Sequence, residues 1–175
     1  MDSSMSQWVS GFISGVGATL IGFLCTILWD VYKYRRDIDQ RDRAIINYVK
    51  HDLEENRNLA TENKSMLMNE LEIIDQGKEL VRPLLLMKTG FWDLLKANLP
   101  KKIINNSDLL ENIQGLSLLG GHINEEIRSR QNYKNASSSM SNYNSTIKIH
   151  DELLVSDIDQ LIMSLDDALA VLQAT

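Results

Sequence analysis

Residues 8–29 read WVSGFISGVGATLIGFLCTILW, and this run is the most informative part of the sequence. No charged residue occurs between Asp2 and Asp30, so the run is apolar or weakly polar throughout. At about 1.5 Å of rise per residue, a helix of this length spans about 33 Å, close to the hydrocarbon thickness of a bilayer. The run therefore predicts a transmembrane helix over residues 8–29, preceded by a short outward-facing segment, residues 1–7.

Aromatic and basic residues mark the ends of this span. Trp8 lies at its start, and Trp29 and Tyr32 lie at its end, where amphipathic rings prefer the membrane interface. The basic residues all follow the span: Lys33, Arg35, Arg36, Arg41 and Arg43. We expect the first three of these to act with the rings as interfacial anchors. A cleavable signal peptide would instead carry its basic residues ahead of a shorter apolar core.

The placement of these basic residues also predicts the orientation of the chain. The positive-inside rule puts the side that carries more Lys and Arg in the cytoplasm. We therefore predict a single-pass protein of the inner or plasma membrane with its N-terminus outside. A basic juxtamembrane helix is expected over residues 30–45, and a cytoplasmic helical domain over residues 46–175.

Small residues repeat at helical spacing along the span: Gly11, Gly15, Ala18 and Gly22. Such a stripe lets two helices approach closely in lipid, where the hydrophobic effect does not drive association. We expect transmembrane helix packing, and hence self-association, along this face. The alternative is that the glycines only reflect the usual composition of membrane helices. A pore would need several copies assembled around the hydroxyl residues of the span.

Beyond the span, apolar residues recur every seven positions. One row is Ile46, Leu53, Ala60, Leu67 and Ile74, and a neighbouring row is Ile38, Ile45, Leu59, Met66 and Ile73, with Asp52 as its only polar interruption. Two adjacent rows make a broad apolar stripe, which is typical of a long helix in a bundle. The helix is predicted to end near residues 75–77. Because no Pro or Gly occurs between Asp30 and Gly77, we expect it to continue from the membrane span.

Three further segments complete the predicted bundle. A short helix over residues 89–98 has Thr89 as its N-cap, and a long helix begins near Ser107 and continues through Gly120. Residues 134–147 are predicted to be a polar connection, and a last amphipathic helix starts at Asp151. The inward residues expected are Leu110, Ile113, Leu116 or Leu119, Ile123 and Ile127, then Leu154, Ile158, Leu161, Leu165, Leu169 and Leu172. The fold class predicted is all-α, a transmembrane helix followed by an antiparallel bundle of three long helices and one short helix.

Composition excludes several functional classes. The formal charge of -6 argues against binding of nucleic acid, which needs a basic face. The single cysteine, Cys25, permits neither a disulfide within the chain nor a thiolate metal site. His51 lies near Glu54 and Glu55, but a solvated helix surface explains that cluster more simply than a metal site. We predict no catalytic, cofactor-binding or metal-binding residues and no cofactor.

The acidic residues of the last predicted helix allow two interpretations. This helix holds Asp151, Glu152, Asp157, Asp159, Asp166 and Asp167 and no Lys or Arg. They form either a solvated face or a docking surface for a basic partner.

The segments HDLEENRNL, residues 51–59, and TGFWDLLK, residues 89–96, look like recurring segments of a known kind of protein. On these segments the chain resembles uncharacterised small prokaryotic single-pass membrane proteins with a cytoplasmic helical bundle, a group that implies an architecture but no activity. The leading hypothesis is a non-enzymatic, membrane-anchored interaction or scaffold protein that contacts the lipid bilayer and either self-associates or docks a protein partner. The alternative is a membrane-perturbing effector, such as a toxin, a holin-like protein or an antiviral-defence membrane protein, whose span oligomerises.

Overall fold

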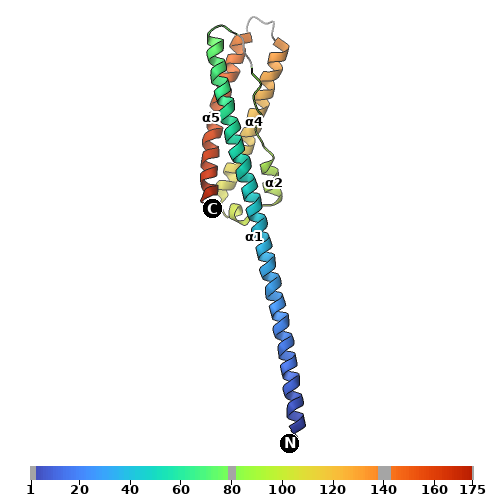
Figure 1. The fold of residues 1–175 in the computed structure, drawn as a ribbon. Coiled ribbons are helices and arrows are strands. Elements are labelled where there is room, and N and C mark those ends of the chain that lie inside the picture. Colours follow the sequence, from blue (N-terminus) through green and yellow to red (C-terminus); the bar gives the residue numbers. More distant parts are fainter. Residues whose placement is uncertain (1–2, 79–81, 138–142, 175) are drawn as a thin grey trace. The chain divides into compact units, whose positions relative to one another are not determined.

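The computed structural model describes residues 3–78, 82–137 and 143–174 of the chain, and it describes side chains from Gly15 onward except at residues 136, 137 and 143. Within these ranges the chain forms five α-helices and no strand (Figure 1). The helices are α1 (Ser3–Asp75), α2 (Phe91–Ala97), α3 (Lys101–Ile104), α4 (Ser107–Ser137) and α5 (Tyr143–Gln173). The prediction of an all-α fold is confirmed.

The chain divides into two compact units, Met1–Asp42 and Arg43–Thr175, and α1 contributes residues to both. The first unit consists of the N-terminal part of α1, and the second contains the rest of α1 and the other helices. The prediction that the apolar run and the first helix of the bundle belong to one uninterrupted helix is confirmed. The absence of Pro and Gly after Asp30 accounts for this continuity, since these are the residues that most disfavour a helix interior.

Gly77 ends α1 where the sequence predicted. Its φ of 74° lies in the left-handed region, which glycine adopts without steric cost. The amide of Gly77 donates to the carbonyl of Ile74 at 2.8 Å, and the amide of Lys78 donates to the carbonyl of Ile73 at 3.2 Å. This pair of bonds is a Schellman motif, which satisfies carbonyls that the helix end would otherwise leave without donors.

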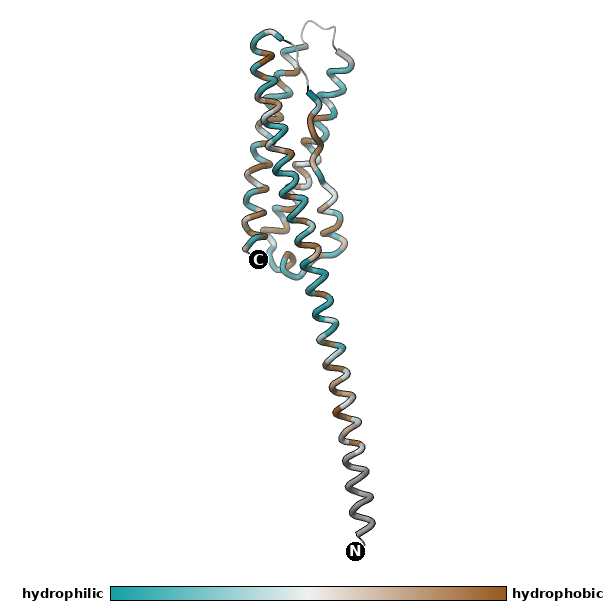
Figure 2. Tube along the Cα trace, in the orientation of Figure 1, coloured by the Kyte–Doolittle hydropathy of each residue, from teal (hydrophilic) through white to brown (hydrophobic). Residues whose placement is uncertain are grey.

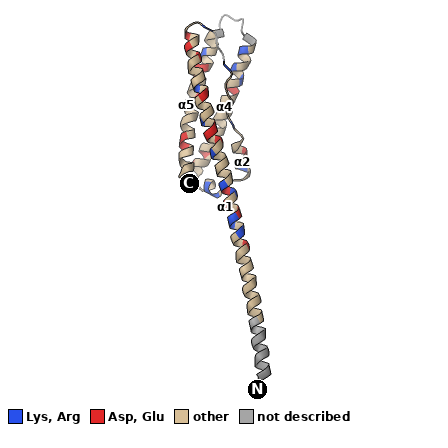
Figure 3. Cartoon of the chain, viewed as in Figure 1, with Lys and Arg blue, Asp and Glu red and all other residues tan. Residues whose placement is uncertain are grey.

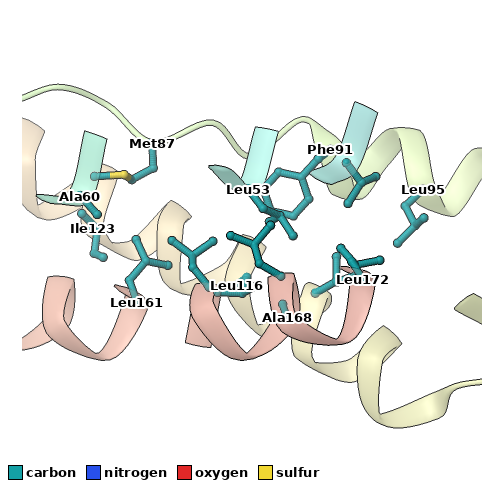
Figure 4. Packing of buried hydrophobic residues seen from close by; sticks show 14 of the residues in the cluster. Leu53, Ala60, Met87, Phe91, Leu95, Leu116, Ile123, Leu161, Ala168 and Leu172 are labelled. Atoms are coloured by element: carbon teal, nitrogen blue, oxygen red, sulfur yellow. The ribbon is translucent and has the colours of Figure 1, made fainter. Parts of the chain in front are cut away.

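The core of the second unit lies between the long helices (Figure 4). All six inward residues predicted for the last helix are buried: Leu154, Ile158, Leu161, Leu165, Leu169 and Leu172. On α4 the prediction is confirmed for Ile113, Leu116, Ile123 and Ile127. Leu110 is partly buried and packs against the core, while the neighbouring Leu109, which was not predicted, is the buried residue of this turn. Between the two alternatives left open, Leu116 is buried and Leu119 is partly buried.

The shorter elements depart from the predictions. Thr89 is not the N-cap of α2, because Gly90 occupies that position and makes no side-chain cap. A second short helix, α3, follows Pro100 and was not predicted; its buried Ile103 joins the core. The bundle therefore contains two short helices instead of one.

The predicted polar connection over residues 134–147 is also mostly helical. Helix α4 continues to Ser137, and α5 already begins at Tyr143. Residues 138–142 lie outside the described ranges. Ile147 explains the earlier start of α5, because it is fully buried in a small cluster with Ile74 and Tyr133. Burial of one such side chain contributes about 1.5–3 kcal/mol, enough to offset a weakly helical sequence.

Ion pairs connect α1 and α5 in a regular register. The pairs are Arg57 with Asp166 at 2.5 Å, Lys64 with Asp159 at 2.6 Å and Asp75 with Lys148 at 2.6 Å. The partner on α5 moves toward its N-terminus as the residue on α1 moves toward its C-terminus, so the two helices are antiparallel. Asp159 and Asp166, two of the six acidic residues considered as a docking surface, thus have basic partners on α1. For the exposed Glu152 and Asp167, docking stays a hypothesis.

Candidate functional site

Hydrophobic residues follow one another along the N-terminal part of α1 (Figure 2). The large apolar side chains described in this part are all exposed. Leu24 is 57% exposed, and the other large apolar residues between Val16 and Tyr34 are comparable. This helix is the one candidate membrane span among the described residues. A continuous apolar surface of this size is rarely left in water, so this part of the chain needs an apolar environment.

The predicted interfacial anchors lie on this same helix. Trp29 and Tyr32 are exposed, and their ring centroids are 6.1 Å apart. Lys33, Arg35 and Arg36 follow within the next turn, where Figure 3 shows a cluster of basic residues along α1. Trp8 falls in the part of the helix whose side chains lie outside the described residues.

The predicted packing face contains Gly15, Ala18 and Gly22, while Gly11 lies outside the residues with described side chains. A Cβ atom added at Gly15 or at Gly22 would meet no atom of the chain within 4 Å. The glycines are therefore not required by packing within one copy of this chain.

Two threonines of the span use their hydroxyl groups internally. Thr19 Oγ1 donates to the carbonyl of Gly15 at 2.8 Å, and Thr26 Oγ1 donates to the carbonyl of Gly22 at 2.9 Å. In hydrocarbon an unpaired hydroxyl donor is costly, and bonding to the carbonyl four residues earlier avoids that cost. These hydroxyls are compatible with lipid around the helix.

A second unusual feature lies in the bundle, where residues 82–88 contain no helix or strand and run beside α1 (Figure 1). We call these residues the strap. Asn56 donates to the carbonyl of Lys88 and accepts from its amide, both at 2.7 Å. Asn63 does the same for Leu85, at 2.7 and 2.8 Å. Glu70 Oε2 accepts from the amide of Arg82 at 3.0 Å. Side chains on α1 thus satisfy the backbone of every third strap residue.

The spacing of these contacts has a geometric cause. Asn56, Asn63 and Glu70 are seven residues apart on one face of α1, a rise of about 10.5 Å per step. Their partners are three residues apart on the strap, and three residues of nearly fully extended chain cover about 10 Å. A heptad row on a helix therefore matches a three-residue repeat on an antiparallel extended segment.

The opposite side of the strap is held by α4. Asn124 Oδ1 accepts from the amide of Met87 at 2.6 Å, and Asn124 Nδ2 donates to the carbonyl of Met87 at 2.8 Å. Arg130 Nη1 donates to the carbonyl of Arg82 at 3.0 Å, and Ser117 donates weakly to the carbonyl of Thr89 at 3.4 Å. Buried backbone groups must find partners, and here side chains from two helices provide them.

One end of the strap meets a cluster of buried charges. The side chain of Arg130 is 1% exposed, and those of Glu70 and Asp151 are fully buried. Arg130 Nε donates to Asp151 Oδ1 at 2.5 Å, and Arg130 Nη2 donates to Glu70 Oε1. Burial raises the pKa of both the Glu70 and the Asp151 carboxyl, and it outweighs the guanidinium of Arg130, which by itself would lower them.

The sequence did not predict the side chains that hold the strap. A third heptad row beside the two apolar rows could have indicated them. This row consists of Val49, Asn56, Asn63 and Glu70, and all four residues are buried. Polar residues at core positions normally indicate solvent exposure, and the strap that pairs with them has no periodic pattern of its own. No residue type in either segment identifies its partner in the sequence.

Comparison with protein-family models, with curated proteins and with solved structures found no match for this chain.

Proposed function

We propose that this protein is a non-enzymatic, membrane-anchored interaction protein whose span crosses the bilayer and whose helical bundle lies on the cytoplasmic side. The observation that carries the proposal is the exposure of every large apolar side chain described between Val16 and Tyr34. Lipid is the environment that such a surface requires, and basic residues after it favour retention of that end in the cytoplasm.

A cleaved signal sequence has the same length and hydropathy as a span. The sequence after residue 29 argues for the anchor, because it reads DVYKYRRD and continues as helix α1 without a small-residue cleavage signal. The same stretch carries the basic cluster that would stop transfer through the membrane.

Self-association is the interaction that the span itself supports. Gly15 and Gly22 have open space around them within the chain, and a second helix packed against this face would use that space. The bundle would then be displayed in two or more copies at the membrane surface, available to a protein partner or to other copies.

A membrane-perturbing effector is less well supported. A water-filled path lined by the span would need free polar groups, and the hydroxyls of Thr19 and Thr26 are already bonded to carbonyls of their own helix. The described part of the span, residues 15–29, contains no charged residue.

Two leucines with the same exposure allow a direct test of the anchor. Leu20 near the centre of the span is 57% exposed, and Leu153 on α5 is 58% exposed. A lysine at the centre of a span costs about 2.5–3.5 kcal/mol on insertion scales. We expect Leu20→Lys to shift the protein from the membrane fraction after alkaline extraction, whereas Leu153→Lys leaves it there. Equal retention of both variants, or release of the wild type, would refute the anchor.

The interaction claim needs its own measurement. Chemical cross-linking of the full chain in native membranes, followed by identification of the products, is expected to yield homo-oligomers or a defined complex with one partner. A protein recovered only as an uncomplexed monomer would contradict it, whatever the outcome for the anchor.

A further inference from the structure

The charged cluster of Glu70, Arg130 and Asp151 has more acid than base in a site without water access. Two carboxyl groups face one guanidinium, and all three side chains are buried. If both carboxyls were ionised, the cluster would carry one uncompensated negative charge. Such a charge is expensive in the interior of a protein, and a carboxyl in this position takes up a proton instead.

The hydrogen bonds indicate where that proton resides. Both oxygens of Glu70 accept, one from Arg130 and the other from the amide of Arg82. Asp151 Oδ1 accepts from Arg130, while Asp151 Oδ2 is buried and has no hydrogen-bond partner among the described residues. Asp151 Oδ2 is thus the one cluster oxygen that accepts from no N–H group. Burial raises the pKa of Asp151 and a side-chain hydrogen bond with Glu70 lowers it, so the proton belongs to the pair of carboxyls and not to Asp151 alone.

The same cluster holds the first residue of the strap. The amide of Arg82 donates to Glu70, and its carbonyl accepts from Arg130. A change of charge within the cluster therefore acts directly on the two backbone groups that fix this end of the strap. The contacts through Asn56, Asn63 and Asn124 involve neutral amides that do not titrate. The last strap residue also makes a charged contact, because Lys88 Nζ lies 2.5 Å from Glu55 and 3.3 Å from Asp52 on α1. Glu55 and Asp52 raise the pKa of Lys88, so this contact persists to a higher pH than an ordinary lysine pair would.

Other titratable groups surround the cluster. On α5, His150 precedes Asp151 in the chain and favours its ionised form when protonated. On α4, Glu126 lies 3.6 Å from His150 Nδ1, and the Tyr133 ring is centred 6.3 Å from the imidazole. On α1 the group in the cluster is Glu70, and the strap contributes the backbone of Arg82. His150 is therefore the neighbouring group whose contribution has to be separated from that of the cluster.

We propose that Glu70 and Asp151 hold a single proton between them, and that its loss at alkaline pH detaches the strap from α1 and α4. The protonated cluster is neutral and keeps Arg82 in place. The deprotonated cluster carries an excess negative charge, and it gains by opening to water. Because Arg82 leads the strap, opening there frees the following residues and withdraws the Met87 side chain from the core, while the packing of α4 against α5 remains.

Amide hydrogen exchange of the full chain, measured against pH and corrected for intrinsic rates, tests the proposal. We expect protection of the Leu85, Met87 and Lys88 amides to fall at least tenfold as pH rises above neutral. Protection of the Ile123 and Ile127 amides in α4 should stay constant over the same range. Constant protection of the strap, or loss of protection in α4 together with the strap, would overturn the proposal.

Three variants identify the group that responds. Asp151→Asn keeps an acceptor for Arg130 and places N–H groups where the proton would be, so the pH response of the strap should disappear. Asp159→Asn, at a surface pair on the same helix, should leave the response unchanged. A response that disappears in His150→Gln but persists in Asp151→Asn would assign the effect to the histidine and overturn the proposal.

A spectroscopic readout does not depend on strap motion. At neutral pH the infrared spectrum of the wild type should contain the C=O band of a protonated carboxyl group, and Asp151→Asn should lack it. Absence of this band from the wild-type spectrum would exclude the shared proton.

Discussion

Asparagine allows a stretch of backbone to lie inside this bundle. Its amide group carries one acceptor and a donor group, so a single side chain can bond both the N–H and the C=O of one residue. Asn56, Asn63 and Asn124 each do so, for Lys88, Leu85 and Met87 respectively. A leucine has nearly the same shape but satisfies neither group, and aspartate lacks the donor.

The three asparagines are not expected to be equivalent. Met87 is 4% exposed, whereas Leu85 is 39% exposed and water can replace a lost partner there. Asn124→Leu leaves two buried backbone groups unpaired and should lower the free energy of unfolding by about 1–3 kcal/mol. Asn63→Leu should cost less. Denaturant unfolding of the full chain in detergent measures both.

Asn69 provides the control for this comparison, because it is an exposed asparagine on α1. Asn69→Leu should change the stability by less than about 0.5 kcal/mol. If Asn124→Leu behaves like Asn69→Leu, the strap is not held by the contacts described above.

Arg130 is the residue whose loss should be most severe. Arg130→Met leaves Glu70 and Asp151 buried without a cation, at a cost of about 3–5 kcal/mol near neutral pH. With no guanidinium to lower their pKa, both carboxyls bind protons in the folded state at pH values where the unfolded chain has lost them. Folding is then favoured by protons, so the loss should shrink as pH falls toward the ordinary carboxyl pKa of about 4.

Lys148→Met is the matched control for Arg130→Met, since Lys148 pairs with Asp75 on an exposed surface. Its cost should be much smaller than that of Arg130→Met and should be screened by salt. A cost for Arg130→Met that is equally small, or that grows on acidification, would contradict the arrangement of the cluster.

Helices with a regular apolar pattern were predictable, and the strap was not. The leucines of α5 recur at intervals of three and four, and each one predicted to be inward is buried. The strap is extended, so its side-chain pattern gives no helical signal, and its position depends on polar groups of two other elements. The start of α5 was also missed, because Ile147 is stabilised by tertiary contact with Ile74 and Tyr133.

The span allows a prediction at the level of a single helix. Gly15 lies on the predicted packing face with Ala18 and Gly22, whereas Gly17 is turned away from it by more than a quarter of the circumference. Both positions have open space within the chain. We expect Gly15→Leu to reduce cross-linking between copies in membranes, and Gly17→Leu to leave it near the wild-type level.

The two variants can be compared directly, because a Cβ atom added at either glycine has no atom of the chain within 4 Å. The bundle should therefore fold equally well in both variants. Cross-linking that is insensitive to Gly15→Leu, or equally sensitive to Gly17→Leu, would show that this face does not pair.

At the scale of the whole molecule, one chain combines an exposed apolar helix with a bundle that has a buried core. The apolar part of α1 satisfies its own polar groups and exposes its apolar side chains, as a helix in lipid does. The bundle does the reverse, because it buries its apolar residues. Side chains of α1 and α4 then form hydrogen bonds with the backbone groups of the strap. Length and hydropathy were sufficient to predict a long apolar helix near the N-terminus and a helical bundle after it, whereas the polar interior of the bundle required the structure.

Cys25 offers the most direct test of the membrane span. It is exposed on the surface of α1, so its own chain leaves the thiol open, and lipid or a second span within the membrane would shield it from a water-soluble maleimide. In opened native membranes we predict that Cys25 is not modified until the membrane is dissolved in denaturing detergent. A cysteine introduced by Met163→Cys, at an exposed position on α5, should react in the same sample at once. Modification of Cys25 at the rate of that second thiol would contradict the membrane span.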